Sequence, residues 1–514
     1  MKVLEGLTEK ERFDFFSKEI LEDGKIIFAG KILQKASEKF PVNVALIYQD
    51  RVITYKELYY MAMLFSKKII EKGVRPSDRV LLFYRNSLEF YVAYFGAWQA
   101  GAVVAPLNIF LRERELNHIL KDSDPALIIT STDKVDFFVE SGVPIFTQED
   151  MELTCGVPDV LPDFEIKALG PDDLAALLYT SGTTGLPKGV MLSSKNIMTN
   201  VAQIFARMPF GQAQRLFCVL PLFHCFAQNT CVWSALFSGS SIVVVPKISR
   251  KDIFAGLQHK PTIMLGVPAL YGLLCLFKTA PLSSVEYFVS GGDALSDKIR
   301  AAFALVYGRK LCNGYGLTET SPLISVDMED VTESTNTVGR SVVGIECRIK
   351  DEHGHVLPQG QIGELWVKGN NIMMGYYNAP EITKNVLVDG WLATGDFAKV
   401  DSNEKLVICG RLKDLIIHKG LNIYPQEIEN VIVGHQDVLR VGVIGKDDEL
   451  HGQVPIAVVQ LRREREGIEK ELRNLCKKEL AAYKIPKRFI IVKDMPLTAT
   501  SKVDKNKVRE QVFK

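Results

Sequence analysis

Apolar runs alternate with amphipathic segments along the first third of the chain. Residues 44–47 and 51–53 are apolar runs separated by a short polar turn, which predicts a pair of strands. Thr54 and Glu57 then have the spacing of a capping box, so a helix is expected to begin there. Apolar residues recur at helical spacing until Gly73 ends the pattern: Leu58, Met61, Phe65 and Ile69.

The alternation continues beyond this first helix. Strands are predicted at residues 79–83, 103–106 and 126–130, and helices at residues 88–99 and 113–121. Strands that alternate with helices are typical of parallel sheets covered by helices. The pattern therefore predicts an α/β protein.

One stretch, residues 91–107, is apolar enough to raise the question of a membrane span. It has only about 17 residues and contains Gln99 and Gly101, whereas a bilayer needs about 20 apolar residues. A buried helix is the better interpretation, and no transmembrane segment is expected. Residues 1–23 are rich in charge and lack the apolar core of a signal peptide, so a cytoplasmic location is predicted.

The composition is that of an ordinary globular protein. The 514 residues are 47% hydrophobic and 24% charged, which excludes disorder and fits two or three domains. A net charge of +1 argues against nucleic acid as a partner. Cys218, Cys225 and Cys231 are the closest cysteines, and their spacing fits no zinc site, so reduced core thiols are expected.

The charge shifts near Gly410. Residues 411–514 hold 21 basic and 15 acidic residues, a charge of +6, so the rest of the chain carries −5. We therefore predict a large body of parallel or mixed sheets covered by helices at residues 1–410, and a small mobile α/β domain at 411–514. The small domain should contain strands at 441–444, 454–460 and 489–492 and a helix at 466–480.

The segment 179–189 has the chemistry of a polyphosphate loop and follows the apolar run 174–178. Its glycines allow close approach of the backbone to an anion, its hydroxyls supply neutral donors, and Lys188 supplies a positive charge. Pro187 stands where the NTPase loop has its second glycine, so the segment is of a different type.

This segment resembles the phosphate loop of the adenylate-forming superfamily, which includes acyl-CoA synthetases, coumarate–CoA ligases, luciferases and the adenylation domains of peptide synthetases. Other signatures of that family follow in its order, and the resemblance extends from about residue 32 to 507. It implies that ATP is bound by the loop residues Thr180, Ser181, Gly182, Thr183, Thr184 and Lys188.

Residues 313–320 are not a dinucleotide-binding turn, because Glu319 stands where that turn needs its third glycine. By the resemblance, Tyr315 stacks on adenine, Thr318 contacts phosphate and Glu319 holds Mg²⁺, a metal role that it also gives to Thr180. One carboxylate plus phosphate oxygens is a usual environment for Mg²⁺. The resemblance further assigns nucleotide binding to Asn313, Gly314 and Gly316.

A second glycine turn follows the strand-like run 285–289. The resemblance implies that the backbone of Gly291 and Gly292 holds the adenine. Asp293 departs from the small residue that the family has there, and its carboxylate either alters the contacts with the base or faces solvent. In the segment 394–396, the resemblance implies that Asp396 accepts hydrogen bonds from both ribose hydroxyls.

The segment 410–420 resembles the hinge between the family's two domains and the loop that meets the thiol acceptor. Arg411 would support the ribose and Lys413 would be the pivot. Pantetheine would pass Lys419 and Gly420, and Asn422 would touch the nucleotide. Ile417 replaces a lysine of some relatives, which argues against luciferase-type oxidation.

The loop 496–505 resembles the one that bears the adenylation lysine, and Lys502 matches that lysine. Its ammonium group would bridge the carboxylate and the α-phosphate and stabilise charge as it develops. Ser501 replaces the usual glycine before it.

Residues 220–227 indicate the class of acid. They offer an aromatic residue and His224 among apolar residues, and no aspartate for an amino group, which resembles the fatty-acyl branch. His224 is expected to gate the site or to position the carboxylate, with a core histidine as the alternative. His118 and Asp122, one helical turn apart, are expected to form a structural pair.

These assignments predict an ATP-dependent fatty acid–CoA ligase that forms an acyl-adenylate with Mg²⁺, releases pyrophosphate and then transfers the acyl group to CoA. An acyl carrier protein as acceptor, an aryl acid such as coumarate, and an inactive scaffold remain alternatives. The sequence leaves open the chain length of the acid, the choice of monomer or homodimer, the role of residues 1–25, and peripheral contact with membranes, into which long-chain acids partition.

Overall fold

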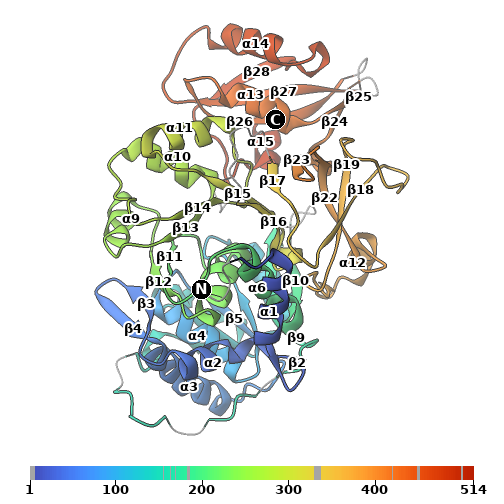
Figure 1. Cartoon of the computed structure of the whole chain (residues 1–514). Coiled ribbons are helices and arrows are strands. Elements are labelled where there is room, and N and C mark those ends of the chain that lie inside the picture. Colours follow the sequence, from blue (N-terminus) through green and yellow to red (C-terminus); the bar gives the residue numbers. More distant parts are fainter. Residues whose placement is uncertain are drawn as a thin grey trace.

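The computed structural model describes residues 6–153, 156–161, 164–167, 169–181, 186–328, 337–418, 421–448, 452–498 and 502–513. A large body holds the N-terminus, and a small domain at the C-terminal end stands on one side of it (Figure 1). The predicted fold class is confirmed. The capping box is also confirmed, because Thr54 Oγ1 accepts from Glu57 N at the start of α3.

Two sheets form the centre of the large body. The first has the order β20 (Gly375–Tyr376), β10 (Pro187–Ser193), β9 (Leu174–Ser181), β6 (Val103–Pro106), β5 (Arg79–Phe83), β7 (Leu127–Thr130), β8 (Ile145–Phe146). The second has the order β16 (Leu323–Asp327), β15 (Cys312–Gly316), β14 (Tyr287–Ser290), β13 (Ile263–Gly266), β11 (Arg215–Cys218), β12 (Ser241–Val244), β3 (Val44–Tyr48), β4 (Arg51–Thr54). Inner strands pair in parallel, and the β9–β10, β15–β16 and β3–β4 pairs are antiparallel.

A shared layer of helices fills the space between these two sheets. It consists of α2 (Ile32–Lys39), α3 (Tyr55–Glu71), α4 (Leu88–Gln99), α6 (Ser194–Arg207), α7 (Cys225–Ala227), a π-helix at Gln228–Ser234 and α8 (Ala235–Phe237). Helix α1 (Glu9–Glu19) packs on α6. The outer faces are covered by α5 (Glu113–Ser123) on the first sheet and by α9 (Arg250–Leu257), α10 (Pro268–Phe277) and α11 (Asp297–Tyr307) on the second.

The two-residue period of the strands explains why both faces of a sheet are apolar. In β5, Val80 and Leu82 face the shared helical layer, while Leu81 and Phe83 face the core under α5. A strand buried on both sides must be apolar at its buried positions, and residues 80–83 are apolar without interruption after the partly exposed Arg79.

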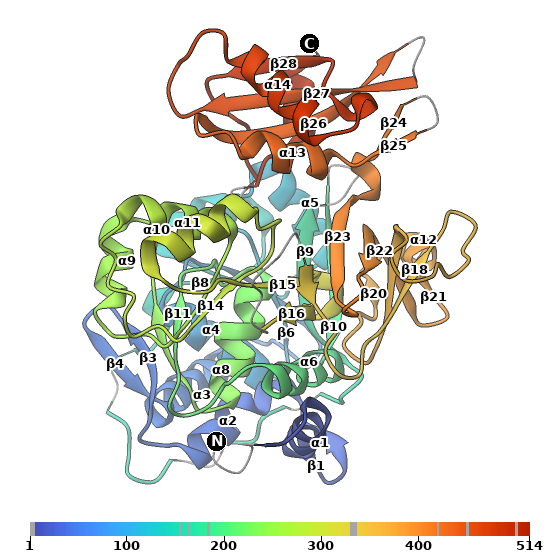
Figure 2. The same cartoon turned by 45° about the horizontal axis from the view of Figure 1, so that its top comes forward.

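A third sheet continues the large body toward the small domain. Its order is β17 (Thr337–Gly339), β23 (Leu406–Arg411), β22 (Trp391–Val400), β19 (Gly363–Lys368), β18 (Glu346–Lys350), with β21 (Leu387–Val388) paired to β22 and α12 (Pro380–Val386) beside it. Strand β23 ends at Arg411, which is the last residue before the chain enters the small domain (Figure 2).

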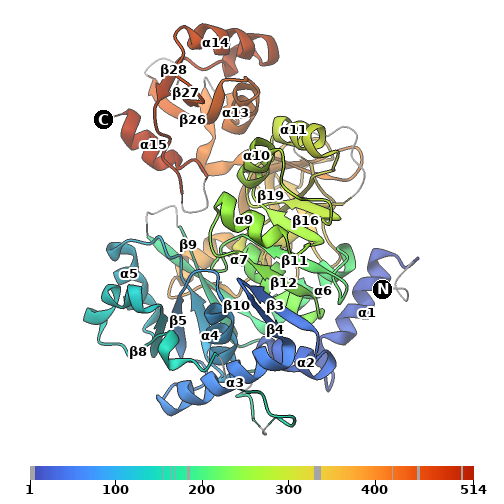
Figure 3. The same ribbon diagram turned by 90° about the vertical axis from the view of Figure 1, so that its left-hand side faces the viewer.

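The small domain has its own sheet and two cores. The sheet runs β25 (Leu421–Ile423), β24 (Ile416–His418), β27 (Gly452–Leu461), β26 (Val438–Asp448), and β28 (Arg488–Val492) pairs with β27. Helices α13 (Pro425–Val433) and α14 (Ile468–Glu479) cover one face and α15 (Lys505–Val512) the other (Figure 3).

The structure corrects the interpretation of residues 91–107 as one buried helix. The stretch is fully buried, but it holds the end of α4, a turn at Gly101 with φ +78°, and β6. No helix of the described ranges is both long and apolar enough to cross a membrane.

Candidate active site at the junction of the two domains

The carboxylate of Asp396 joins three segments at the centre of the site. Asp396 lies in β22 with only 2% of its surface exposed. Tyr315 Oη donates to its Oδ2 at 2.6 Å, and Arg411 Nε lies 3.0 Å from its Oδ1. Burial, with a further contribution from this carboxylate, raises the pKa of Tyr315, and the carboxylate raises the pKa of Arg411, so the phenol and the guanidinium keep their protons. Each oxygen of Asp396 still has capacity to accept a second donor such as a hydroxyl.

A second group of side chains lies on the β9–β10 hairpin and next to it. Thr180 and Lys188 are cross-strand partners, and Lys188 Nζ lies 5.8 Å from the ring centre of Tyr376. Tyr376 Oη donates to Glu319 Oε1 at 2.8 Å, and Met373 N donates to the backbone oxygen of Glu319 at 2.9 Å. Glu319 is thus held by one oxygen, which leaves Oε2 to meet a cation or a water.

The tip of this hairpin lies outside the described residues. Gly182, Thr183 and Thr184 belong to it, and for Ser181 only the backbone pairing with Pro187 is described. Thr318 is half-buried in the short helix at Thr318–Thr320.

The second glycine turn needs glycine at both positions, at Gly291 because of space and at Gly292 because of the backbone conformation. A Cβ on Gly291 would meet the ring of Phe226 at 3.2 Å, and Gly292 has φ +79°, which L side chains rarely adopt. Asn313, on the neighbouring strand, is buried and donates from Nδ2 to Thr337 O at 3.1 Å.

His224 begins the short helix α7 and uses its ring as the cap. Phe226 N donates to Nδ1 at 3.2 Å, so the proton of the neutral ring is on Nε2. Burial and the charge of Lys502 lower the pKa of His224 to about 4. The ring is therefore neutral near pH 7, with an N–H on its free side.

Lys502 lies within electrostatic reach of Asp293, Asp396 and Arg411 of the large body. Burial lowers its pKa, the carboxylates of Asp293 and Asp396 act in the opposite sense, and Arg411 reinforces the lowering. Thr498 Oγ1 accepts from Lys502 N at 3.2 Å, and Thr498 N donates to Lys502 O at 2.7 Å. Asp293 is exposed, so of the two alternatives for it the structure favours solvent, with Lys502 as its charged neighbour.

The short segment that connects the two domains is held by charged contacts at both of its ends. Arg411 pairs with Asp396 in the β22–β23 ladder, whereas Asp414 lies 3.8 Å from Lys505 and 3.7 Å from Arg509 of α15. Lys413 lies between these anchors, in the short helix at Leu412–Asp414.

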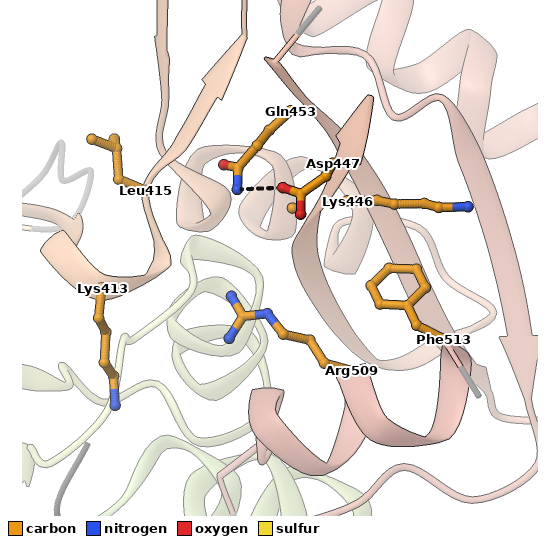
Figure 4. Close-up of a pocket in the computed structure, with 8 residues that line it drawn as sticks. Lys413, Leu415, Lys446, Asp447, Gln453, Arg509 and Phe513 are labelled. Carbon is orange, nitrogen blue, oxygen red and sulfur yellow. Dashed lines mark hydrogen bonds between the residues drawn. The ribbon is translucent and has the colours of Figure 1, made fainter. Parts of the chain in front are cut away.

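A pocket of about 550 Å³ opens next to this segment and is lined by Lys413, Leu415, Gly445, Lys446, Asp447, Gln453, Arg509 and Phe513. Figure 4 shows Arg509 in the space between Lys413 and Asp447, to which Gln453 Nε2 donates at 3.2 Å. Its lining residues come from the connection between the domains and from the small domain, and they include none of the residues grouped around Asp396 and Glu319.

Two further groups of predicted residues lie elsewhere. Asn422 is exposed on β25 opposite Ile417, and Lys419 and Gly420, like Ser501, lie outside the described residues. His118 and Asp122 do not pair with each other: His118 Nε2 donates to Pro187 O at 2.9 Å, and Asp122 Oδ2 accepts from Tyr179 Oη at 2.7 Å. Both hold the β9–β10 hairpin where β9 ends and β10 begins.

Comparison with known families identifies the chain. The pattern of the AMP-binding enzymes matches residues 33–377, and that of the AMP-binding enzyme C-terminal domain matches residues 427–502. The chain belongs to the AMP-binding enzymes. This is the adenylate-forming superfamily that its motifs resemble.

Relatives of this AMP-binding enzyme cover nearly its whole length. A feruloyl-CoA synthase of Amycolatopsis is 31% identical over 92% of this chain and 96% of its own. A long-chain-fatty-acid–CoA ligase of Bacillus subtilis is 29% identical over 93% and 94%. ATP-bound MatB from Rhodopseudomonas palustris is 30% identical with a TM-score of 0.86, over 94% of this chain and 98% of its own, whereas apo MatB gives 0.76 at the same coverage.

Sequence reasoning missed Tyr376, which the structure places between Lys188 and Glu319. It follows Gly375 in a two-residue strand, and nothing in its spacing links it to either residue. The long-range pairing of β20 with β10, in which Tyr376 is opposite Val190, brings it to the site. A signal of that kind is absent from a single sequence.

Gly316 should be indispensable for folding of this AMP-binding enzyme, whereas Gly314 should not. A Cβ on Gly316 would lie 1.9 Å from Pro322 O, which is backbone and cannot move aside, but on Gly314 the nearest atom is at 3.5 Å. We expect Gly316→Ala to lose about 3 kcal/mol or more of unfolding free energy and Gly314→Ala less than about 1 kcal/mol. Melting temperatures of both variants measure this, and equal values would contradict it.

The stability of the protein should fall in acid partly because His224 is held neutral in the folded state. An unfolded histidine titrates near pH 6.5, and His224 in the folded protein has a pKa of about 4. As pH falls from 6.5 to 4, the unfolded chain takes up this proton first, so stability is lost across that window. We expect a smaller loss in His224→Gln than in the wild type, measured as melting temperature against pH. His353→Gln, at an exposed position, is the control and should follow the wild type.

Proposed function

We propose that the protein is an AMP-forming ligase that joins a fatty acid to CoA by way of an acyl-adenylate. The observation that carries the proposal is the neighbourhood of Lys502. Burial lowers the pKa of this lysine near the C-terminus, and the charges of Asp293, Asp396 and Arg411 in the large body act on it as well. Lys502 is also the charged neighbour of His224.

The first step would join the carboxylate of the acid to the α-phosphorus of ATP. Two anions must approach each other, and Lys502 would place its positive charge between them, where it stabilises the charge that develops on the phosphorus oxygens. Tyr315 would provide a surface for adenine, and Asp396 would accept from the ribose hydroxyls. The bond from the α-phosphorus to the bridging oxygen breaks, and pyrophosphate leaves.

Lys188 and Thr180 face the same end of the site as Glu319, where the pyrophosphate would lie. The donor set fits Mg²⁺, because Glu319 keeps one carboxylate oxygen free of Tyr376 and Thr180 supplies a hydroxyl, both hard oxygen ligands. Bound there, Mg²⁺ would neutralise phosphate charge. Tyr376 would fix the direction of the Glu319 carboxylate.

The second step would need a different arrangement of the domains. The thiolate of CoA must attack the carbonyl carbon of the adenylate, which breaks the bond between that carbon and AMP. Once the small domain has turned, Lys502 would no longer stand in the path of the thiolate. We propose Lys413 as the pivot, supported by the anchors at Arg411 and Asp414 on either side. The loop with Lys419 and Gly420 would then line the thiol path, with Asn422 near the nucleotide.

The acid is proposed to be a fatty acid because of the surroundings of His224. The helical segment after it, from Cys225 to Phe237, is almost completely buried and includes the apolar and aromatic residues Val232, Trp233 and Leu236. The neutral imidazole N–H of His224 can hold a carboxylate without an aspartate nearby. The relatives named for long-chain fatty acids support this choice. Those named for feruloyl and coumaroyl groups support an aryl acid as the second candidate.

A panel of acids tests the substrate class. We expect pyrophosphate release with ATP and saturated acids of increasing length, and rates at least tenfold lower with ferulate and coumarate at equal concentration. Thioester should appear with CoA alone. If aryl acids react faster, the second candidate is correct. If thioester requires a carrier protein, the acceptor is not free CoA.

Lys502 should be needed for only one of the two steps. Lys502→Ala is expected to slow ATP–pyrophosphate exchange by about 10²–10³-fold, the usual cost of one group that stabilises transition-state charge. Thioester formation from supplied acyl-adenylate and CoA should keep the wild-type rate. Lys507→Ala, at an exposed lysine of α15 that pairs with the nearby Asp504, is the matched control for folding and should keep the wild-type rate of both steps. Equal loss of both steps in Lys502→Ala would contradict this role.

A further inference from the structure

The large body and the small domain also touch through a lysine outside every recognised motif. Lys298 lies in the first turn of α11, and its Nζ donates to the backbone oxygens of Val433 at 3.0 Å and His435 at 2.8 Å. Val433 is the last residue of α13 in the small domain, and His435 lies two residues beyond it. Figures 1 and 3 both show α11 directly beside α13 at the junction of the domains.

The end of α13 is a suitable target for a cation. The last carbonyl groups of a helix have no partner within it and carry the negative end of the helix dipole. The last turn of α13 contains no basic residue of its own. Lys298 therefore supplies from the large body the positive charge that a helix usually draws from its own last turn.

The end of α13 moves with the rest of the small domain. Ile428 and Ile432 of α13 are buried in the same core as Leu472 of α14. Just beyond α13, His435 Nε2 lies 3.5 Å from Glu471, and Asp437 is bound to Arg465. A group that holds Val433 and His435 therefore holds the orientation of the entire small domain.

The contact belongs to the arrangement in which Lys502 occupies the site. Asp293 and Lys298 follow β14 on one segment of the large body; the first is a charged neighbour of Lys502 and the second binds the end of α13. The same arrangement is closer to ATP-bound than to apo MatB, by TM-scores of 0.86 and 0.76. A turn of the small domain about Lys413 would move the α13 carbonyls away from Lys298.

The surroundings of Lys298 limit the strength of this contact. Burial and the nearby Arg462 lower the pKa of Lys298, while Asp437 acts in the opposite sense. The bonds to two carbonyl oxygens offset part of the cost of burying the ammonium group. Such a contact can stabilise one arrangement and still be released in each catalytic cycle.

We propose that Lys298 is a positioning residue that holds the small domain in the arrangement for adenylate formation, by binding the C-terminus of α13. The inference rests on the proposed two-step function. In this role Lys298 contacts neither the acid nor ATP nor CoA. Its effect is on the fraction of enzyme in which Lys502 is in place.

Lys298→Met tests the proposal in the full-length protein, with Lys298→Arg as the conservative variant. We expect Lys298→Met to slow ATP–pyrophosphate exchange about tenfold, which corresponds to 1.4 kcal/mol. Conversion of supplied acyl-adenylate and CoA to thioester should be unchanged or faster, because the second arrangement loses a competitor. Lys298→Arg should recover most of the exchange rate, since guanidinium can also donate to two carbonyl oxygens.

Lys251→Met, an exposed lysine on the neighbouring helix α9, controls for loss of a surface charge and should match the wild type in both assays. Equal losses in both half-reactions of Lys298→Met, or no loss in either, would overturn the proposal. Absence of exchange in the wild type with every acid would refute the proposed function instead. The two failures are therefore distinguishable.

Discussion

The buried carboxylate of Asp396 is the interaction on which the junction of the two domains depends. A carboxylate with 2% exposure is costly to bury unless donors surround it, and here Tyr315 and Arg411 do so. These partners come from β15 and from the last residue of β23, so one anion ties two sheets together. It also fixes Arg411, the last residue of β23, next to the connection to the small domain.

The distribution of charge follows from this arrangement. The chain as a whole is nearly neutral, but the last 104 residues carry +6 and the remainder −5. The positive part is the one that bears Lys502 and would approach ATP. Withdrawal of Lys502 from water lowers its pKa, and the carboxylates of Asp293 and Asp396 offset part of that cost. Overall neutrality therefore argues against nucleic acid but not against phosphate chemistry.

Local patterns in the sequence predicted local structure well. The strands at 79–83 and 103–106 and the helix at 88–99 have the predicted bounds, because each is short, strongly apolar and ended by a clear break. Pairing between distant segments could not be predicted in the same way. The order of the sheets, the position of Tyr376 beside Glu319 and the contacts of His118 with Pro187 and of Asp122 with Tyr179 all depend on partners far along the chain.

The motifs predict which residues carry the chemistry, and the structure adds the contacts that hold these residues in place. Between Arg411, tied to Asp396, and Asp414, tied to α15, only Leu412 and Lys413 connect the anchored parts. If the small domain turns about Lys413 as proposed, a connection this short would allow rotation with little translation. Contacts away from Lys413 would then help to select the orientation of the small domain. The bonds from Lys298 to Val433 and His435 are a contact of this kind, away from Lys413. Even a modest interaction there would affect the orientation of the small domain and therefore the position of Lys502.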